Sequence, residues 1–163
     1  MISAVCPGSF DPVTLGHIDI ITRASQMFDK VYVVIMINPK KMPSFSAKER
    51  IELLQATTTG LKNIEIEAFD GLLADFVRQK NSHIIVKGLR AVSDFEYEFQ
   101  MALANRRLDP ETETVFLTTS ADNMFLSSSV VKQIAQFGGD ISTFVPNEVC
   151  DRIAERLKKE EKA

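Results

Sequence analysis

Two side chains that can bind phosphate, Ser9 and His17, lie in the stretch from Pro7 to His17, which contains two glycines and two prolines. The apolar run from Ile2 to Cys6 predicts a strand, which we expect to end at Pro7-Gly8 because proline cannot donate to a central ladder. After Gly16 the apolar residues follow helical spacing, so His17 falls in the first turn of a helix. The unpaired N–H groups and positive dipole end of a helix start attract anions. The stretch therefore predicts a phosphate site.

Spacing alone leaves a second interpretation of this turn open. A histidine at a helix start often serves only as a cap or as a surface residue, and such a loop is often only a turn. The stretch contains neither the Gly-x-Gly-x-x-Gly pattern of dinucleotide-binding folds nor the Gly-Lys-Ser/Thr of a P-loop. The phosphate site and the plain capped turn are both kept as hypotheses at this point.

The rest of the chain alternates between strand and helix patterns. Strand patterns cover residues 31–37, 64–67, 83–86 and 114–117, and the second of these alternates in polarity, as a strand near a sheet edge does. Helical patterns begin near Ser46, which has capping-box spacing to Glu49, and near residues 71, 93, 127 and 147. This order predicts an α/β fold, with one domain over residues 1–163 and a doubly wound parallel five-stranded sheet.

Cations and hydroxyl groups follow the predicted strands at the edge of the sheet where doubly wound folds bind their ligands. The cations are Lys40, Lys41, Lys87 and Arg90, and serines gather between residues 119 and 129. A loop lysine on its own is usually only solvated, but the convergence of these groups predicts a polyphosphate ligand. His83 lies at the opposite end of its strand, and we assign it no role.

Composition argues against several classes of function. With 163 residues, 45% hydrophobic content and a net charge of −3, the chain can bury a full core and lacks the basic balance of a general nucleic-acid binder. No apolar run reaches the ~20 residues of a membrane helix, and no signal-peptide pattern is present, so we expect a cytoplasmic protein with no membrane partner. Cys6 and Cys150 are expected to be free thiols, and the histidines supply no zinc ligand set.

Three motifs together resemble a known family. The string GSFDPVTLGH, which ends at His17, is similar to the signature of the adenylyltransferase and cytidylyltransferase superfamily, with TLGH as its (His/Thr)-x-Gly-His motif. The KGLR block that begins at Lys87, the DFEYE that follows it, and the FLSSSVVK that begins at Phe125 are similar to segments of bacterial phosphopantetheine adenylyltransferases. The resemblance runs in order from Val5 to Pro146.

This resemblance implies a Rossmann-like nucleotidyltransferase fold and transfer of the adenylyl group of ATP to 4′-phosphopantetheine, which yields dephospho-coenzyme A and pyrophosphate in coenzyme A biosynthesis. It also implies Mg²⁺ bound through the phosphates rather than by protein ligands, a homohexamer, and coenzyme A as a feedback inhibitor. We expect direct in-line attack by the acceptor without a covalent enzyme intermediate. Two alternative functions stay open: a sister enzyme such as a nicotinate-nucleotide adenylyltransferase, and a non-catalytic ATP-binding sensor. The DFEYE block argues against the first.

The resemblance further implies a role for individual residues. His17, Lys41 and Ser9 would act on the transferred phosphate, and Ser9, Lys41, Leu73 and Lys87 would bind the acceptor. The ATP site would comprise Ser9, Phe10, His17, Gly88, Leu89, Arg90, Glu98, Asn123, Met124, Phe125, Leu126, Ser127, Ser128 and Ser129.

The chain departs from the family pattern at two of its cations. Lys87 stands where arginine is common in the family. A lysine cannot form the two parallel hydrogen bonds that a guanidinium group donates, so it would orient the acceptor phosphate less tightly. Met42 stands where some relatives have another lysine. Without the family, Glu98 is better explained as part of a solvated helix face, and plain N-capping would explain one of the three serines.

Overall fold

The computed structural model describes residues 1–40, 42–90 and 92–158. It contains one parallel sheet of five strands in the order β3-β2-β1-β4-β5. The strands are β1 (Ser3–Gly8), β2 (Lys30–Met36), β3 (Ile64–Phe69), β4 (Ile84–Leu89) and β5 (Glu113–Thr118). The helices are α1 (Leu15–Met27), α2 (Ala47–Thr57), α3 (Leu73–Gln79), α4 (Val92–Leu108), the 3-10 turn η1 (Ala121–Asn123), α5 (Ser128–Gln136) and α6 (Asn147–Leu157). The doubly wound sheet predicted from the sequence is confirmed, including the place of β3 at an edge.

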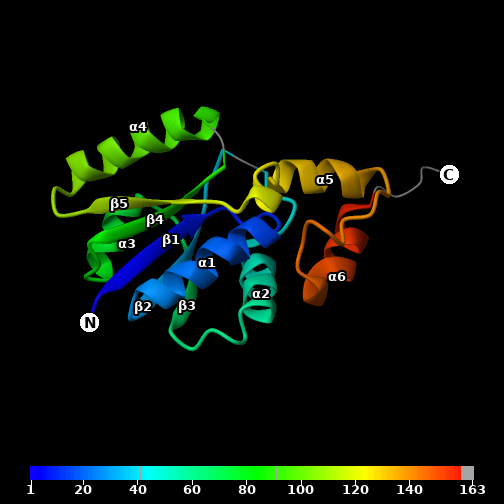
Figure 1. Ribbon diagram of the computed structural model, residues 1–163, viewed down its shortest axis with the longest axis horizontal. Helices are drawn as coiled ribbons and strands as arrows, with labels where there is room; N and C mark the ends of the chain where they lie inside the picture. Colours follow the sequence, from blue (N-terminus) through cyan, green and yellow to red (C-terminus); the bar gives the residue numbers. More distant parts are fainter. Residues whose placement is uncertain (41, 91, 159–163) are drawn as a thin grey trace.

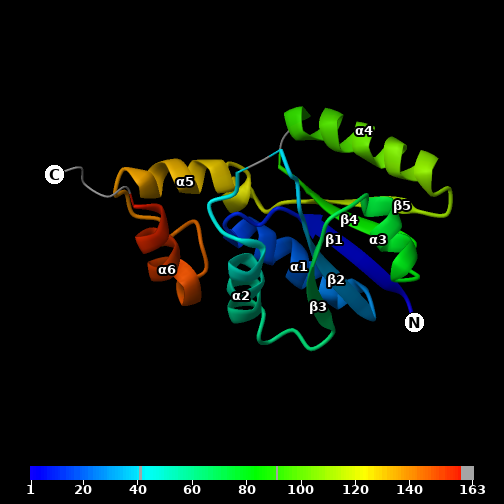
Figure 2. The ribbon, with the colours of Figure 1, turned by 180° about the vertical axis from the view of Figure 1, so that it is seen from behind.

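Helices cover both faces of the sheet (Figure 1). One face packs against α1 and α2, and the larger core continues from there to α5 and α6, as Ile21, Leu53, Val131 and Ile153 show. The other face carries α3 and α4, which Figure 2 shows from behind. A smaller core lies under α3. The strands are therefore buried on both faces, which explains the continuous apolar run of β2.

The first strand ends at the predicted Pro7-Gly8 step, with both residues inside the strand. β1 continues through Pro7 to Gly8 in the middle of the sheet, paired along its length with β2 from Ser3↔Lys30 to Gly8↔Ile35. Its pairing with β4 is at Val5↔Ile85. The strand tolerates proline because β1 and β4 have already separated where Pro7 lies.

The strand order reverses between β1 and β4. β2 and β3 lie on one side of β1, whereas β4 and β5 lie on the other. Ligands of open α/β sheets bind beyond the carboxyl ends of the strands at such a point. The separation of β1 from β4 thus opens the sheet at the position where a ligand is expected.

Two smaller predictions can also be compared with the structure. Cys6 and Cys150 are free thiols, as expected. In the part of the chain that the structure describes, no helix combines the length and the apolar character needed to cross a membrane.

Candidate active site

A cavity of about 530 Å³ lies between the carboxyl ends of β1 and β4. Its walls come from β1 and the turn after it, from the start of α1, from the end of β4, from α4, and from the start of α5. Of the residues singled out in the sequence, it is lined by Ser9, Phe10, His17, Lys87, Gly88, Arg90, Glu98, Leu126, Ser127, Ser128 and Ser129. Segments that are distant in the sequence therefore meet at the predicted edge of the sheet.

His17 forms a reciprocal cap with Thr14 at the start of α1. The backbone N–H of Thr14 donates to Nδ1 of His17 at 3.0 Å, and the backbone N–H of His17 donates to Oγ1 of Thr14 at 3.4 Å. A nitrogen that accepts a hydrogen bond from a backbone N–H carries no proton. In the neutral ring the proton therefore lies on Nε2, and His17 is a hydrogen-bond donor through that atom.

The ring of His17 is neutral at physiological pH. Burial, and then the positive charges of Arg90 and Lys87, lower the pKa of His17 from 6.5 to about 4. Because Lys87 and Arg90 line the same cavity, the site keeps its positive charge on those two side chains. The histidine contributes a polarised N–H beside them.

Phe10 fixes the position of the histidine ring. Its own ring meets the imidazole edge-on, with centroids 5.0 Å apart and planes inclined at 71°. Phe10 is buried and adopts a left-handed backbone conformation with φ 47°, which is unfavourable for a non-glycine residue. A Cβ added to Gly8 would lie 2.8 Å from the Phe10 ring, so the glycine leaves room for this arrangement. Gly8 is thus required for packing at this point.

Two cations at the carboxyl end of β4, Lys87 within the strand and Arg90 directly after it, are each paired with a carboxylate of α4. Nζ of Lys87 lies 3.2 Å from Oε2 of Glu98, and Nε of Arg90 lies 2.9 Å from Oδ2 of Asp94. Arg90 also donates through Nη1 to the carbonyl oxygen of Leu126 at 2.7 Å. The end of β4, the start of α4 and the segment before α5 are therefore joined by charged side chains at the cavity wall.

The start of α5 presents hydroxyl groups to the same cavity. Ser127 is the N-cap, and its Oγ accepts from the backbone N–H of Val130 at 3.2 Å. Ser128 donates to the carbonyl oxygen of Pro12 at 2.7 Å, and Ser129 is exposed. N-capping therefore explains one of the three serines, as expected from the sequence. Of the other two, Ser128 binds the turn before α1, and Ser129 lines the cavity. The positive end of the α5 dipole lies at this cavity, where it would stabilise a bound anion.

The chain is similar to known proteins over nearly its whole length. Residues 5–134 match the family model described as cytidylyltransferase-like. The chain is 56% identical to the phosphopantetheine adenylyltransferase of Caldanaerobacter subterraneus subsp. tengcongensis, over 96% of this chain and 98% of that protein. It is 53% identical to the phosphopantetheine adenylyltransferase of Clostridium kluyveri, over 100% of this chain and 98% of that protein. The chain belongs to the phosphopantetheine adenylyltransferase family.

A solved structure supports the fold of this family member. The putative nicotinate-nucleotide adenylyltransferase from Vibrio parahaemolyticus superimposes with a TM-score of 0.59 at 19% identity, covering 96% of this chain and 99% of that one. At that identity the likeness concerns the fold alone.

Several residues that the phosphopantetheine adenylyltransferase resemblance singled out lie outside the cavity lining. Leu73 packs against the smaller core under α3, and Phe125 meets Phe144 edge-on. Asn123 donates to Oγ of Ser120 at 2.9 Å, while Leu89 ends β4 and Met124 is exposed. Lys41 lies outside the described residues. The structure thus brings eleven of the predicted site residues together in one cavity and leaves the other described ones outside its lining.

The sequence reasoning missed a group of charges beside the cavity, of which Asp11 and Arg50 are buried and Lys132 is half-buried. Asp11, Arg50 and Lys132 line a second cavity of about 500 Å³, which shares Ser9, Ser128 and Ser129 with the first. It also missed the capping role of Thr14, for which there was a signal. Thr14 stands three residues before a side chain that can accept from its backbone N–H, as in a capping box.

Proposed function

We propose that this chain transfers the adenylyl group of ATP to 4′-phosphopantetheine, yielding dephospho-coenzyme A and pyrophosphate, a step of coenzyme A biosynthesis. The full-length relatives that bear the name phosphopantetheine adenylyltransferase support the reaction. One structural observation carries the mechanism: a neutral His17, with its proton on Nε2, lines the same cavity as two cations and the positive end of α5. This is an arrangement for stabilising charge on a phosphoryl group.

In the proposed mechanism the acceptor phosphate attacks in line. One of its oxygens forms a bond to the α-phosphorus of ATP, and the bond from that phosphorus to the bridging oxygen breaks, so that the electron pair leaves with pyrophosphate. Nε2–H of His17 donates to an α-phosphate oxygen as charge develops there, and Ser9 and Lys41 steady the transferred group. Lys87 binds the acceptor phosphate. Arg90, Glu98 and residues 123–129 hold the nucleotide, with Gly88, Leu89 and Phe10 beside it.

No described side chain near His17 is suited to forming a covalent adenylyl intermediate. In His17 itself, Nδ1 is occupied by the N–H of Thr14 and Nε2 carries the proton, so neither nitrogen offers a lone pair. The Cys6 thiol lines the cavity, but burial raises its pKa to about 12 and keeps it protonated. Ser9 would need a neighbouring base, and His17 is already engaged as a donor. Direct transfer in a ternary complex follows.

Exchange of labelled pyrophosphate into ATP tests this mechanism. The enzyme is incubated with ATP, Mg²⁺ and labelled pyrophosphate, with and without 4′-phosphopantetheine. Direct transfer predicts label in ATP only when the acceptor or its adenylylated product is present. Exchange without acceptor at a rate comparable to turnover would require an adenylyl-enzyme and would overturn the mechanism, while product formation in the complete mixture tests the reaction itself.

The described residues fit Mg²⁺ that arrives with the nucleotide. They contain no cluster of three or more His, Cys, Asp or Glu side chains placed to hold a metal ion. The two carboxylates at the cavity, Asp94 and Glu98, are paired with Arg90 and Lys87. Bound through phosphate oxygens and water, the ion would offset the charge of the triphosphate. Chelation by EDTA should abolish turnover, and added Mg²⁺ should restore it.

Exposed apolar side chains along α4 support assembly into a homo-oligomer. Phe95, Phe99, Met101, Leu103 and Leu108 are each 39–54% exposed on this helix. Apolar side chains gathered on a surface mark interfaces. We take the assembly to be a homohexamer, as the family resemblance implies, and light scattering of the purified protein tests it. Cytoplasmic location and inhibition by coenzyme A are part of the same proposal, and the latter is tested by adding coenzyme A to the assay.

A further inference from the structure

We propose that Asp11 is a positioning residue for adenylyl transfer, which holds the turn after β1 against α5 and against the segment that leads into α2. The inference rests on the transfer reaction proposed above. Asp11 is only 6% exposed and lines the second cavity, which adjoins the one lined by His17 but is not itself lined by His17. It therefore acts through its neighbours and does not touch the reacting phosphate.

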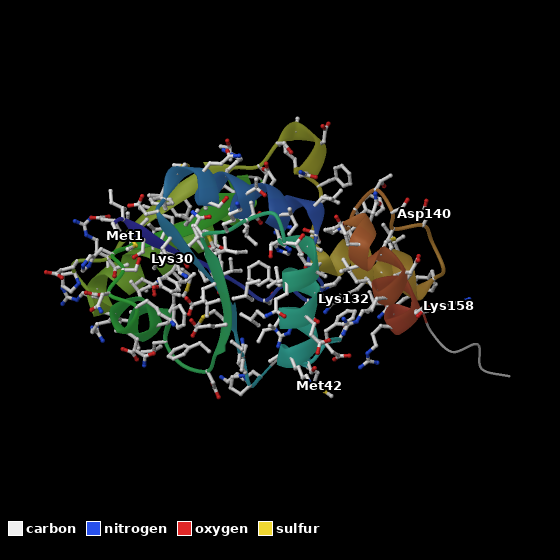
Figure 3. The ribbon with its side chains drawn as sticks, turned by 90° about the horizontal axis from the view of Figure 1, so that it is seen from below. Met1, Lys30, Met42, Lys132, Asp140 and Lys158 are labelled. Atoms are coloured by element: carbon white, nitrogen blue, oxygen red, sulfur yellow. The ribbon has the colours of Figure 1, made fainter. Side chains whose placement is uncertain are left out.

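The carboxylate of Asp11 binds three groups that are distant in the sequence. Oδ1 accepts from the backbone N–H of Phe45 at 2.9 Å, and Oδ2 accepts from the backbone N–H of Ser44 at 3.0 Å. Oδ2 is also paired with the ammonium group of Lys132, which Figure 3 shows between α5 and α2. Charge-assisted hydrogen bonds of this kind are the stronger ones in proteins. A single buried side chain thus joins the turn after β1 to two other segments.

Both neighbours of Asp11 reach the site. Phe10 packs its ring against His17, and the carbonyl oxygen of Pro12 accepts from Oγ of Ser128 at 2.7 Å. The carbonyl oxygen of Ser9 accepts from Nη1 of Arg50 at 2.9 Å, which ties the same turn to α2. A shift of Asp11 would therefore move the histidine ring and the start of α5 relative to each other.

These are the two sides between which the α-phosphate is proposed to react. His17 comes from one side, and Ser128 and Ser129 come from the other. Misplacement of catalytic groups by about 1 Å can cost 10²-fold in rate, whereas binding through many contacts tolerates it better. Loss of the Asp11 carboxylate should therefore lower turnover much more than nucleotide binding.

The test compares Asp11→Asn with a control variant that loses similar bonds elsewhere. Asn63 lies beside the amino end of β3, and its Nδ2 donates hydrogen bonds to the carbonyl oxygens of Ser25 and Phe28 at 2.8 and 2.9 Å. Asn63→Ala thus removes a bridge between segments at the opposite end of the sheet. For both variants and the wild type we would measure Tm, saturating kcat and the Kd of a non-hydrolysable ATP analogue.

We expect Asp11→Asn to lower kcat by about 10- to 10²-fold, with less than about a threefold change in the Kd of the ATP analogue. We expect Asn63→Ala to lower Tm, while its kcat stays within about twofold of the wild-type value. If Asp11→Asn does not fold, because its amide faces two N–H donors, Asp11→Ala removes the carboxylate without that conflict and carries the same expectation. A kcat within twofold of the wild type would refute the proposal. The proposal would also be refuted if kcat fell only as much as analogue binding and the folded fraction of the protein fell. Wild-type turnover with 4′-phosphopantetheine tests the reaction separately.

Discussion

The backbone N–H of Thr14 donates to Nδ1 of His17, at 3.0 Å, and thereby decides which nitrogen of the ring carries the proton. The donor that remains, Nε2–H, belongs to a ring whose pKa is lowered to about 4 by burial and by the nearby cations. The positive charge that a polyanion meets in this cavity therefore comes from Lys87 and Arg90. In the proposed mechanism the histidine adds a directed hydrogen bond, which acts most strongly when charge develops on the α-phosphate.

Replacement of His17 by alanine should lower kcat by about 10²–10³-fold and change ATP binding much less, because the lost hydrogen bond acts mainly in the transition state. Steady-state kinetics together with the Kd of an ATP analogue measure both effects. The matched control is His83→Ala. His83 precedes β4 at the opposite end of the sheet, so its replacement should leave kcat unchanged. Unchanged kcat in His17→Ala would favour the non-catalytic ATP sensor.

Replacement of Gly8 by alanine should lower kcat by about 10-fold or more, although residue 8 contributes no functional group. The added Cβ would lie 2.8 Å from the Phe10 ring, which must then move away from its contact with His17. Gly60→Ala is the control, because a Cβ there meets nothing within 4 Å. Equal kcat values for the two variants would show that Phe10 does not position the histidine.

The stability of the free enzyme should fall as pH is lowered from about 6.5 towards 4. In this window the unfolded chain binds a proton at His17 that the folded protein does not, since the pKa is 6.5 in one state and about 4 in the other. The loss attributable to His17 is about 3 kcal/mol at the acid end of the window. Urea unfolding at pH 7, 5.5 and 4.5 measures it. His17→Gln should show a correspondingly shallower dependence, and identical slopes for both proteins would contradict a depressed pKa.

Replacement of Lys87 by methionine should raise KM for 4′-phosphopantetheine by about 10-fold or more and affect KM for ATP less, because Lys87 is assigned to the acceptor phosphate. Lys87→Arg retains the charge and should remain active. Pantetheine without its phosphate should not be turned over by the wild type. Equal rates with the two acceptors, or a larger effect of Lys87→Met on ATP, would mean that the cations have been assigned wrongly.

Most of the fold could be predicted because its signals are local. The capping box of Ser46 and Glu49 at the start of α2 spans three residues, and the apolar run of β2 is continuous in the sequence. The edge position of β3 followed from alternation within that strand. The inclusion of Pro7 in the paired part of β1 could not be predicted, because it depends on where β1 separates from β4, and that is a property of the assembled sheet.

The site was predictable only in part, for the same physical reason. Residues that follow strands could be placed at one edge of the sheet, which brought His17, Lys87 and the serines of α5 together. The partners of Asp11 lie 33, 34 and 121 residues away, so no spacing in the sequence indicates them. The pairing of Lys87 with Glu98 likewise depends on how α4 lies against β4.

The stereochemical course at the α-phosphorus tests the central claim most directly. ATP carrying sulfur at one α-phosphate position of known configuration is turned over with 4′-phosphopantetheine, and the configuration of the product phosphorothioate is determined. A single in-line displacement, with His17 as a donor and the acceptor phosphate as the nucleophile, predicts inversion. Retention would show two displacements through a covalent adenylyl-enzyme, and direct transfer at this site would then be wrong.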